Sequence, residues 1–518
     1  MSTADIKSKQ GDFSKGSVPV LILKLGLPIM LAEMVVVLYN IVDRAYIGHM
    51  GETGTLAITG LGVCFPLITF ISAFANLCST GGTTLATIAR GEHKDGKAER
   101  MMATSFTLLL IIGAVLTVLL FAIAPWILEI LGGDESSLPY AVDYFRIYVI
   151  GTVPVLISLG MNPFITAQGF PKIGMSTVVL GAVLNIALDP LFIFVFDMGI
   201  RGAALATVIS QSASALWVVL FLCSKRPPLR LKRLLIDKKQ LPGLIKLGAT
   251  GFTFKVTTSM TQAVVNIMLK SFGGDLRTLY VGAMSLANSV REIMSLPNSG
   301  VTAAGQNVMS YNYGAKQNKR VSECIRFIFV SGLIVNVILW LAMLFIPGPV
   351  FRIFSDDEEL IRLTVHCARI YFGAFPFMAL QMSGQTTFVA LNYPKHALFF
   401  SMLRKILLVT PLTLLLPNIG MGVDGVFWAE FLSQMLGASI CFTTMYFTIW
   451  SKMKKGTTEA AGTYLLFRGP QEQGDSGRPG DPPLSHSRFV WQVSGSNYCI
   501  HLLMTVELKN THHYLKIW

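Results

Sequence analysis

Long apolar stretches alternate with short polar connections along most of the chain. The stretch 21–48, LILKLGLPIMLAEMVVVLYNIVDRAYIG, is typical, because a bilayer-spanning helix needs about 20 mostly apolar residues. Similar stretches recur up to residue 450, and they predict an all-α polytopic membrane protein with twelve transmembrane helices. We place these spans at 18–47, 55–88, 101–128, 139–164, 171–196, 201–223, 242–270, 278–310, 321–347, 361–391, 395–416 and 422–450.

The second half of the chain repeats the first in one register. Residues recur 223 positions later at Arg146-Ile147-Tyr148 and Arg369-Ile370-Tyr371, at Pro171-Lys172 and Pro394-Lys395, and at Gln211 and Gln434. One offset held over several matches indicates an internal repeat. Because each repeat contains six spans, both enter the membrane from the same side. We therefore expect two pseudo-symmetric six-helix bundles, with a site between or within them near the midplane.

This pattern divides the chain into five parts. They are an N-terminal tail (1–17), a six-helix lobe (18–223), a basic linker (224–241), a second six-helix lobe (242–450) and a polar tail (451–518). Gly, Pro, Ser and charged residues dominate GPQEQGDSGRPGDPPLSHSR in the last part. Such a composition does not bury enough apolar surface to fold, so we expect a disordered tail and assign it no function.

Composition agrees with a membrane protein and gives its orientation. The chain is 52% hydrophobic and 14% charged, with a net charge of +13. One set of connections and the two tails together contain 22 Lys and Arg residues, whereas the connections on the opposite side contain four. By the positive-inside rule both termini and the linker are cytoplasmic, in a multi-pass protein of the cell membrane. Membrane topology thus explains the basic residues, and we expect a lipid bilayer, not nucleic acid, as the partner. The seven cysteines lack CxxC spacing, so disulfides and structural zinc are not expected.

The first span carries polar side chains that lipid does not tolerate unassisted. Glu33, Tyr39, Asn40, Asp43 and Arg44 fall within an arc of about 140° on one side of the helix. An ionisable residue inside a span is by default a hypothesis for a functional site. The simpler interpretation is that the Asp and Arg form an ion pair at the membrane interface.

The fifth and sixth spans add a second polar group. Asn185 and Asp189 are four residues apart and share a helical face, although the Asp could simply mark a helix end before a proline. Thr207 lies in the sixth span. Together with Asp43 of the first span, these residues offer two carboxylates with hydrogen-bond partners. Such a pair can hold and release a proton or coordinate Na⁺, and the sequence leaves both ions open.

The second half does not repeat these acids. The 223-residue offset places Asn266 opposite Asp43, and Leu412 or the nearby Thr410 opposite Asp189. Its own ionisable residues in the spans include Lys255. We name as candidate substrate-cavity residues Glu33, Asn40, Gln211, Met284, Arg291, Glu292, Phe377, Gln381, Met382 and Glu430. The alternative is that Arg291 and Glu292 pair inside the bundle and that the Met and Phe residues serve packing alone.

Several motifs of other protein classes are missing. The sequence contains no G-x-x-x-x-G-K-[ST] phosphate loop, no H-E-x-x-H and no G-x-S-x-G. ATP-driven transport by this chain and common membrane hydrolases therefore lack their signatures. Transport driven by an ion gradient remains, with no catalytic residues, no cofactor and no structural metal. H⁺ or Na⁺ is the expected coupling ion, with possible Na⁺ binding at Asp43 and Asp189.

Between residues 18 and 450 the chain resembles the MATE (multidrug and toxic compound extrusion) family of cation-coupled exporters. The likeness rests on YNIVDRAYIGH in the first span, ITAQGFPK, NIALDP and GIRGAALAT around the fifth and sixth, and SYNYGAK after the eighth. The resemblance implies a V-shaped pair of six-helix bundles and alternating access. It also implies export of organic cations or dyes against H⁺ or Na⁺, and we expect a monomer.

The resemblance also implies where coupling occurs. In one branch of the family, a Tyr and Asp on helix 1, an Asn and Asp on helix 5 and a Thr on helix 6 couple transport. These carry over onto Tyr39, Asp43, Asn185, Asp189 and Thr207. Other members use a Glu on helix 7 and an Asp on helix 10, but here 244–270 and 371–391 contain no acid. This departure favours coupling in the first lobe.

The leading hypothesis is a cation-coupled antiporter that exports organic cations, drugs or toxic compounds. Within transport, the alternative is a flippase or exporter of a lipid-linked sugar or another anionic substrate, supported only by Lys255 and Arg291. Outside transport, the alternative is a membrane-embedded enzyme or receptor. Missing catalytic constellations and the lack of a folded soluble domain argue against it.

Overall fold

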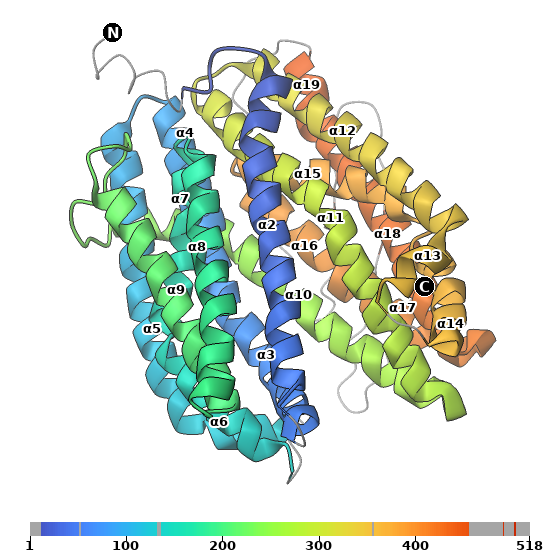
Figure 1. The fold of residues 1–518 in the computed structure, drawn as a ribbon. Helices are drawn as coiled ribbons and strands as arrows, with labels where there is room; N and C mark the ends of the chain where they lie inside the picture. Colours follow the sequence, from blue (N-terminus) through green and yellow to red (C-terminus); the bar gives the residue numbers. More distant parts are fainter. Residues whose placement is uncertain are drawn as a thin grey trace, which may run out of the picture. The chain divides into compact units, whose positions relative to one another are not determined.

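The computed structural model describes residues 12–50, 53–131, 136–354 and 357–454, and the dipeptides 490–491 and 502–503. Helices make up almost all of the regular structure (Figure 1). The first half contains α2 (Val18–Gly48), α3 (Gly54–Cys78), η2 (Ser79–Thr83), α4 (Thr84–Gly91), α5 (Asp95–Ile130), α6 (Leu138–Ile150), α7 (Thr152–Ala167), α8 (Pro171–Pro190), η3 (Leu191–Val195) and α9 (Ile200–Cys223).

The second half repeats this order of helices. It contains α10 (Leu241–Phe272), η4 (Gly274–Leu276), α11 (Arg277–Gly314), α12 (Asn318–Phe345), α13 (Pro347–Arg352), α14 (Glu358–Tyr371), η5 (Phe375–Phe377), α15 (Met378–Ala390), α16 (Pro394–Met402), η6 (Leu403–Val409), α17 (Thr410–Leu416), η7 (Pro417–Met421), α18 (Asp424–Met445), η8 (Tyr446–Trp450) and α19 (Ser451–Lys454). The segments α8 and α16 both begin at a proline, 223 residues apart, where a missing N–H costs the helix nothing.

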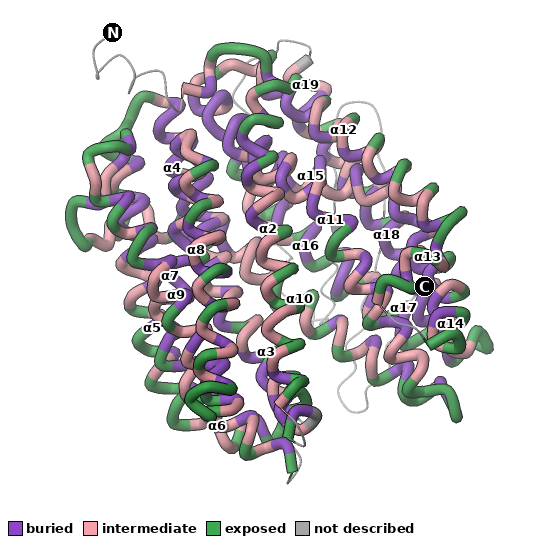
Figure 2. The backbone as a smooth tube through the Cα atoms, in the orientation of Figure 1, coloured by how far each residue is buried: buried purple, intermediate pink, exposed green. Residues whose placement is uncertain are grey.

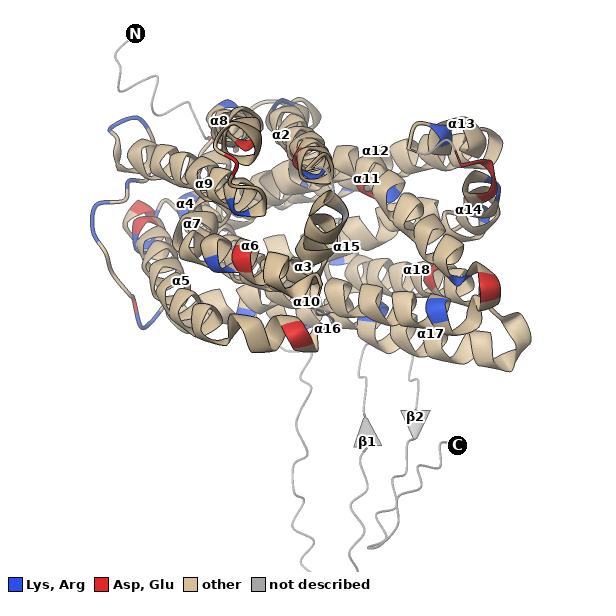
Figure 3. Cartoon of the chain, turned by 60° about the horizontal axis from the view of Figure 1, so that its bottom comes forward, with Lys and Arg blue, Asp and Glu red and all other residues tan. Residues whose placement is uncertain are grey.

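The helices match the predicted membrane spans. Within the described residues, eight helices are long and apolar enough to cross a membrane, or up to ten if each of two bent pairs forms one span. The pairs α6 with α7 and α14 with α15 bend by 59° and 48°. The other two predicted spans correspond to α10 and α11, which have 32 and 38 residues but are not among the helices that are apolar enough by this criterion. Charged residues lie mostly near helix ends and in connections (Figure 3). The predicted all-helical membrane fold is confirmed.

Two lobes of packed helices meet along α2, which contacts α8 of its own half and α11 of the other half. Figure 1 shows α2 between the two groups. Buried residues form one core within the first half and two further clusters, one of which includes the start of α2 and the end of α11. Figure 2 shows buried residues on the inner faces of the helices and exposed ones outside. Exposed Leu, Ile, Val and Phe side chains on the outer faces fit a lipid environment.

The contact between the lobes repeats the pseudo-symmetry of the sequence. Gly26 of α2 meets Gly300 of α11 so closely that an added Cβ would lie 2.8 Å from the Gly300 carbonyl oxygen. Gly248 of α10 meets Leu77 of α3, and a Cβ there would lie 2.1 Å from the Leu77 oxygen. Gly26 and Gly248 lie 222 positions apart, one fewer than the offset of 223 that relates Leu77 and Gly300, so the two contacts join corresponding helices of the repeat. The same glycine contact is therefore built twice.

A second repeated pair joins the far ends of α4 and α11. A Cβ on Gly91 would lie 2.0 Å from the carbonyl oxygen of Tyr311, and a Cβ on Gly314 would lie 2.1 Å from that of Ile88. Both glycines are 223 positions apart, as are the two residues that they contact. Only glycine fits such an approach of two backbones, so these positions fix the lobes against each other at this end.

The last residues of the predicted N-terminal tail pack against this same end. Phe13 is buried and stacks edge-on against Tyr311, with ring centroids 5.5 Å apart. Asn312 donates to the Phe13 carbonyl at 3.0 Å, and Arg320 donates to the Gly16 carbonyl at 2.8 Å. Residues 1–11 of this tail lie outside the described residues.

The basic connection between the halves is fastened to the first lobe. Lys232 pairs with Glu99 at 2.7 Å, and the backbone N–H of Asp237 donates to Thr104 at 3.0 Å. The Gln240 side chain donates to Asp237, which lowers the pKa of that carboxyl. The segment 224–240 is thus packed by specific contacts as well as serving as a connection.

The predicted disordered tail lies mostly outside the described residues. Its first four residues extend the last helix as α19. In the unit that begins at residue 457, β1 (Val490–Trp491) pairs antiparallel with β2 (Leu502–Leu503).

Candidate functional site

The two predicted acids of the first lobe come together. Asp43 extends from α2 and Asp189 from the last turn of α8, and their carboxyl groups interact within hydrogen-bonding reach. Asp189 is 0% exposed. The helical path continues from α8 into the π-helical turn η3, so this Asp does not mark the free end of a helix. The pair thus lies inside the lobe.

The hydrogen bonding of this pair is incomplete without a shared cation. Asn185 donates to Oδ1 of Asp189 at 3.2 Å. Oδ2 of Asp189 and Oδ1 of Asp43 are buried and meet no donor among the described residues. Two ionised carboxylates only repel each other, whereas a shared proton or a bound cation lets them face each other. The geometry therefore suits reversible binding of a positive ion.

Aromatic hydroxyls surround the two acids. Tyr39 of α2 lies near both carboxyl groups. Thr207 of α9 hydrogen-bonds with Tyr144 of α6, which lies beside Asp43. Tyr144 stacks on Tyr148, with ring centroids 6.1 Å apart, and both are buried. Four of the five predicted coupling residues thus form one cluster, and Thr207 joins it through Tyr144.

The side chains on the polar face of α2 lie in three different environments. Asp43 turns inward, whereas Asn40 is exposed, as is Arg44, whose guanidinium lies 5.8 Å from the ring centre of Phe65. Glu33 accepts a hydrogen bond from Ser299 of α11 in the other lobe. The single polar face that the sequence predicts is therefore divided, because α2 lies between two lobes and contacts both.

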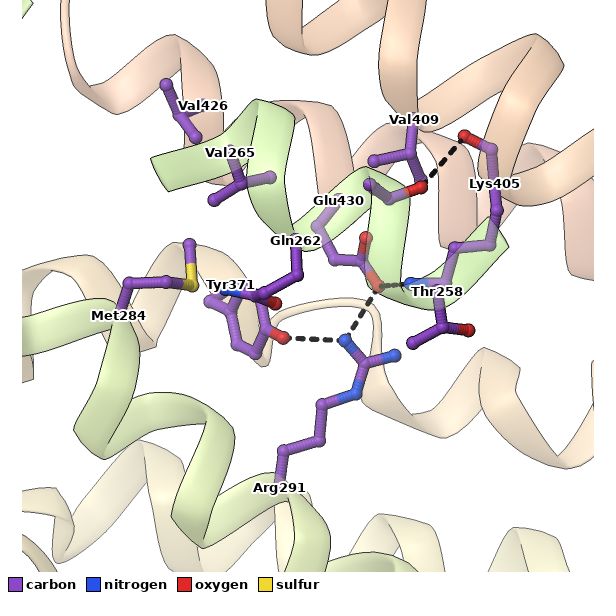
Figure 4. Close-up of a pocket in the computed structure, with 11 residues that line it drawn as sticks. Thr258, Gln262, Val265, Met284, Arg291, Tyr371, Lys405, Val409, Val426 and Glu430 are labelled. Atoms are coloured by element: carbon purple, nitrogen blue, oxygen red, sulfur yellow. Dashed lines mark hydrogen bonds and ion pairs between the residues drawn. The ribbon is translucent and has the colours of Figure 1, made fainter. Parts of the chain in front are cut away.

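The second lobe contains a cluster of basic side chains around one carboxylate, in contrast to the two acids of the first lobe (Figure 4). Arg291 of α11 donates to Oε1 of Glu430 at 2.7 Å and to the Tyr371 hydroxyl at 2.6 Å. Arg404 donates to the same Oε1 at 2.8 Å, and Nζ of Lys405 lies 3.6 Å from it. Three cations thus converge on one carboxylate oxygen. Arg404, Lys405 and Glu430 are each at most 8% exposed.

Arg404 and Lys405 occupy the π-helical turn η6, which lies between α16 and α17. Pro411 follows shortly after this turn and has no N–H to continue the regular hydrogen-bond ladder. Such turns often mark functional sites in helices. The prediction from sequence missed both cations, although the adjacent Arg and Lys within the predicted span 395–416 were the available signal.

The ten predicted substrate-cavity residues do not line one common pocket. Met284, Arg291 and Glu430 line a single pocket of the second lobe, together with Tyr371 and Lys405. Two predicted residues have other partners: Glu33 pairs across the lobes, and Gln211 accepts from Ser158 at 2.7 Å. The remaining five, Asn40, Glu292, Phe377, Gln381 and Met382, do not line that pocket, and Asn40 and Glu292 are exposed.

The described residues contain no group of three or more His, Cys, Asp or Glu side chains placed to hold a metal ion. The six cysteines that lie in this part of the chain are free thiols. The carboxylate pair is therefore the candidate site for a positive ion, with two acids and neutral oxygen ligands around it.

Comparisons with known proteins agree with this architecture. The sequence profile of the MatE family matches residues 28–191 and 256–415, together more than half of the chain. The chain is 22% identical over 451 residues to the multidrug export protein MepA of Staphylococcus haemolyticus, covering 87% of this chain and 97% of that protein. It is 21% identical over 436 residues to MepA of Staphylococcus aureus strain MSSA476, covering 84% and 95%.

Solved structures show the same fold. A crystal structure of MATE in complex with MaL6 superposes with a TM-score of 0.80 at 20% identity, covering 86% of this chain and 99% of that one. An outward-facing multidrug resistance MATE family transporter of the MOP superfamily gives the same score, identity and coverage. A MOP superfamily transporter from Pyrococcus furiosus, described by the reverse polarity of its binding pocket, gives 0.79 at 20% identity, also covering 86% and 99%.

The resemblance predicted from the sequence is thus confirmed, and the interpretation as an enzyme is excluded. The match of the family profile to both six-helix repeats of an all-helical membrane fold assigns the molecule. The chain belongs to the MatE family of multi-pass, ion-coupled membrane transporters.

Proposed function

We propose that this transporter is an antiporter that exports organic cations, with Asp43 and Asp189 as its coupling site. The observation that carries the proposal is the closeness of these two carboxyl groups, each of which has one buried oxygen that lacks a donor among the described residues. An ion that binds between them stabilises whichever lobe arrangement keeps them together. A coupling ion drives transport only through such a difference in affinity between two states.

We further propose H⁺ as the coupling ion, with Na⁺ as the alternative. The direct contact of the two carboxyl groups suits a shared proton, because a Na⁺ ion held between them would separate the oxygens. Tyr39, Asn185 and, through Tyr144, Thr207 hold the pair in place by hydrogen bonds or close contact. Protonation would then favour one arrangement of α2 against α8 and loss of the proton the other.

The alternating states would follow from the glycine contacts between the lobes. If both termini are cytoplasmic, as the loop charges predict, the lobes are joined on the cytoplasmic side by Gly91, Gly314 and the buried Phe13. That arrangement gives a substrate access from outside, and opening these contacts gives access from the cytoplasm. The names of the relatives, multidrug export proteins, support organic cations and drugs as substrates.

The test uses purified full-length protein in proteoliposomes with ethidium as substrate. A pH jump, a Na⁺ jump and no jump are applied to the wild type and to Asp43→Asn, Asp189→Asn and Asp197→Asn. Asp197 is an exposed acid of the same lobe at φ +50°, a conformation that Asn tolerates, so its variant is the matched control.

We expect the pH jump alone to drive ethidium transport by the wild type and by Asp197→Asn. Asp43→Asn and Asp189→Asn should still reach the membrane, but their rate of ethidium transport should fall at least about tenfold. Full transport by Asp43→Asn and Asp189→Asn would overturn the coupling site. Transport driven only by the Na⁺ jump would keep the site and replace the proposed ion.

A further inference from the structure

The buried charge cluster of the second lobe is not balanced. Arg291, Arg404 and Lys405 face one carboxylate, Glu430, and within the described residues every ion pair of the three cations goes to that carboxylate. The two arginines alone exceed the single carboxylate by one positive charge, and a protonated Lys405 adds a second. Removing an ion from water costs several kcal/mol even after relaxation of the protein. A buried excess of this kind calls for an anion.

A free donor beside the cluster points to the same conclusion. Gln434 of α18 is 6% exposed, and its Oε1 accepts from Arg404 at 2.7 Å. Because Arg only donates, this bond fixes the orientation of the amide. Its Nε2 is buried and meets no acceptor among the described residues. Gln434 lines a pocket that Arg291 and Tyr371 also line. An amide donor without an acceptor among the described residues and a cation therefore lie in the wall of the same cavity.

The space around the cluster is amphipathic. One pocket contains Thr258, Gln262 and Lys405 in its wall and leaves a cavity of only about 20 Å³, room for little more than a water molecule. The adjoining pocket, with a cavity of about 10 Å³, adds Phe372 and Phe375. Arg291, Tyr371 and Glu430 line both pockets, as Figure 4 shows for the first. A ligand with one charged end and a flat apolar body would meet matching walls only after the lining side chains move apart.

We propose that this cavity binds a small aromatic carboxylate. The guanidinium of Arg291 matches the two oxygens of a carboxylate, and the free amide of Gln434 supplies a further donor. The aromatic wall of Phe372 and Phe375 takes the ring by edge or face contact. The net charge of the cluster favours the anion over a cation of the same shape.

This anion site is separate from the acid pair of the first lobe, so it does not depend on the proposed ion coupling. It adds a second class of ligand to a transporter proposed above for organic cations. A compound with both a cationic and a carboxylate group would meet complementary charges in the two lobes. The site itself is defined by binding, which can be measured without transport.

The test measures binding to purified full-length protein by titration calorimetry and by the shift of its thermal unfolding midpoint. The probes are 2-naphthoate, the cation 2-naphthylmethylammonium and the neutral 2-naphthylmethanol, which share one ring system. We expect saturable binding and a raised midpoint with 2-naphthoate alone. Equal binding of the three probes, or no saturable binding of 2-naphthoate, would overturn the proposal.

Variants locate the site. Arg291→Gln should weaken 2-naphthoate binding at least tenfold, whereas Arg326→Gln, the same change at an exposed position of α12, should leave it unchanged. Gln434→Met keeps the length of the side chain without the free donor and should weaken binding several-fold. If Arg291→Gln fails to fold, Gln434→Met still decides, because wild-type affinity in that variant contradicts the proposed site.

Two further experiments distinguish a carboxylate ligand from a lipid phosphate, and the anion site from the proposed coupling site. Preferential binding of short-chain phosphatidylglycerol over 2-naphthoate would replace the carboxylate with a lipid phosphate and overturn the assignment. Asp189→Asn should keep 2-naphthoate binding while losing driven ethidium transport. Failure of the anion site therefore leaves the coupling site untouched, and the reverse also holds.

Discussion

The two lobes have the same backbone plan and opposite buried charge. In the first lobe Asp43 and Asp189 face each other with neutral partners, whereas in the second Arg291, Arg404 and Lys405 surround Glu430. The repeat places Gly181 and Ala182 opposite Arg404 and Lys405, so the same helix carries small residues in one lobe and cations in the other.

The two halves thus share close packing contacts and differ in their buried charges. The contact of Gly91 with Tyr311 and that of Gly314 with Ile88 occur in both copies, because two backbones meet and any side chain would displace a helix. A buried charge depends on a few side chains and can change while the helices stay in place. The lobes are therefore symmetric in packing and asymmetric in chemistry.

The largest expected effect comes from the part that both lobes share. Gly314→Leu and Gly91→Leu each insert a side chain where a Cβ alone would lie 2.0 to 2.1 Å from a carbonyl oxygen. Both variants should lose transport almost completely, because the lobes can no longer close at this end. Ethidium transport in proteoliposomes measures the loss. Gly62→Ala, where nothing lies within 4 Å, is the control and should transport normally. Normal transport by either Leu variant would contradict the closure.

The second prediction separates the lobes by stability. Glu430→Ala leaves the buried Arg404 and Lys405 and the half-buried Arg291 without their shared carboxylate and should cost about 3–5 kcal/mol of unfolding free energy. Asp189→Asn should change it by less than about 1 kcal/mol, because the carboxylate has an oxygen without a donor among the described residues. The shift of the thermal unfolding midpoint in detergent measures both. Equal losses in the two variants would contradict the proposed difference between the clusters.

A smaller effect is expected at two equivalent tyrosines. Tyr371 accepts from Arg291 at 2.6 Å and donates to Asn288 at 2.9 Å, whereas its repeat partner Tyr148 stacks on the ring of Tyr144. Tyr371→Phe should cost about 1–2 kcal/mol of unfolding free energy, and Tyr148→Phe should cost less. Thermal unfolding of the two variants side by side tests this order, and a reversed order would refute it.

The smallest effect concerns the connection, which is tied to the first lobe. The pKa of Asp237 is lowered by the hydrogen bond from Gln240, so the folded state favours the ionised carboxyl. Its stabilisation is full above the ordinary pKa of 3.8 and is lost as the pH falls through the lower folded value. Solvent screens this site, so Asp237→Asn should have only a small destabilising effect at neutral pH and none in strong acid, below both pKa values. Unfolding midpoints at the two extremes check the difference.

Much of the fold could be predicted because its determinants are local. A bilayer demands long apolar helices, and this requirement marks most of the spans in the sequence. The offset of 223 residues then reveals the two halves, and in the structure α8 and α16 both begin at a proline of that repeat. The bend between α14 and α15 was not predicted, because it depends on packing against neighbouring helices.

The candidate site divides in the same way. Residue type and helical spacing determined that Asp43, Asn185 and Asp189 belong to polar faces of intramembrane helices, because a charged side chain that faces lipid is costly. Only the tertiary structure decided that the two acids touch, that Glu33 crosses to Ser299, and that Tyr144 links Thr207 to the pair. The sequence of one helix specifies its own faces, but which face meets which helix depends on the packing of all the others.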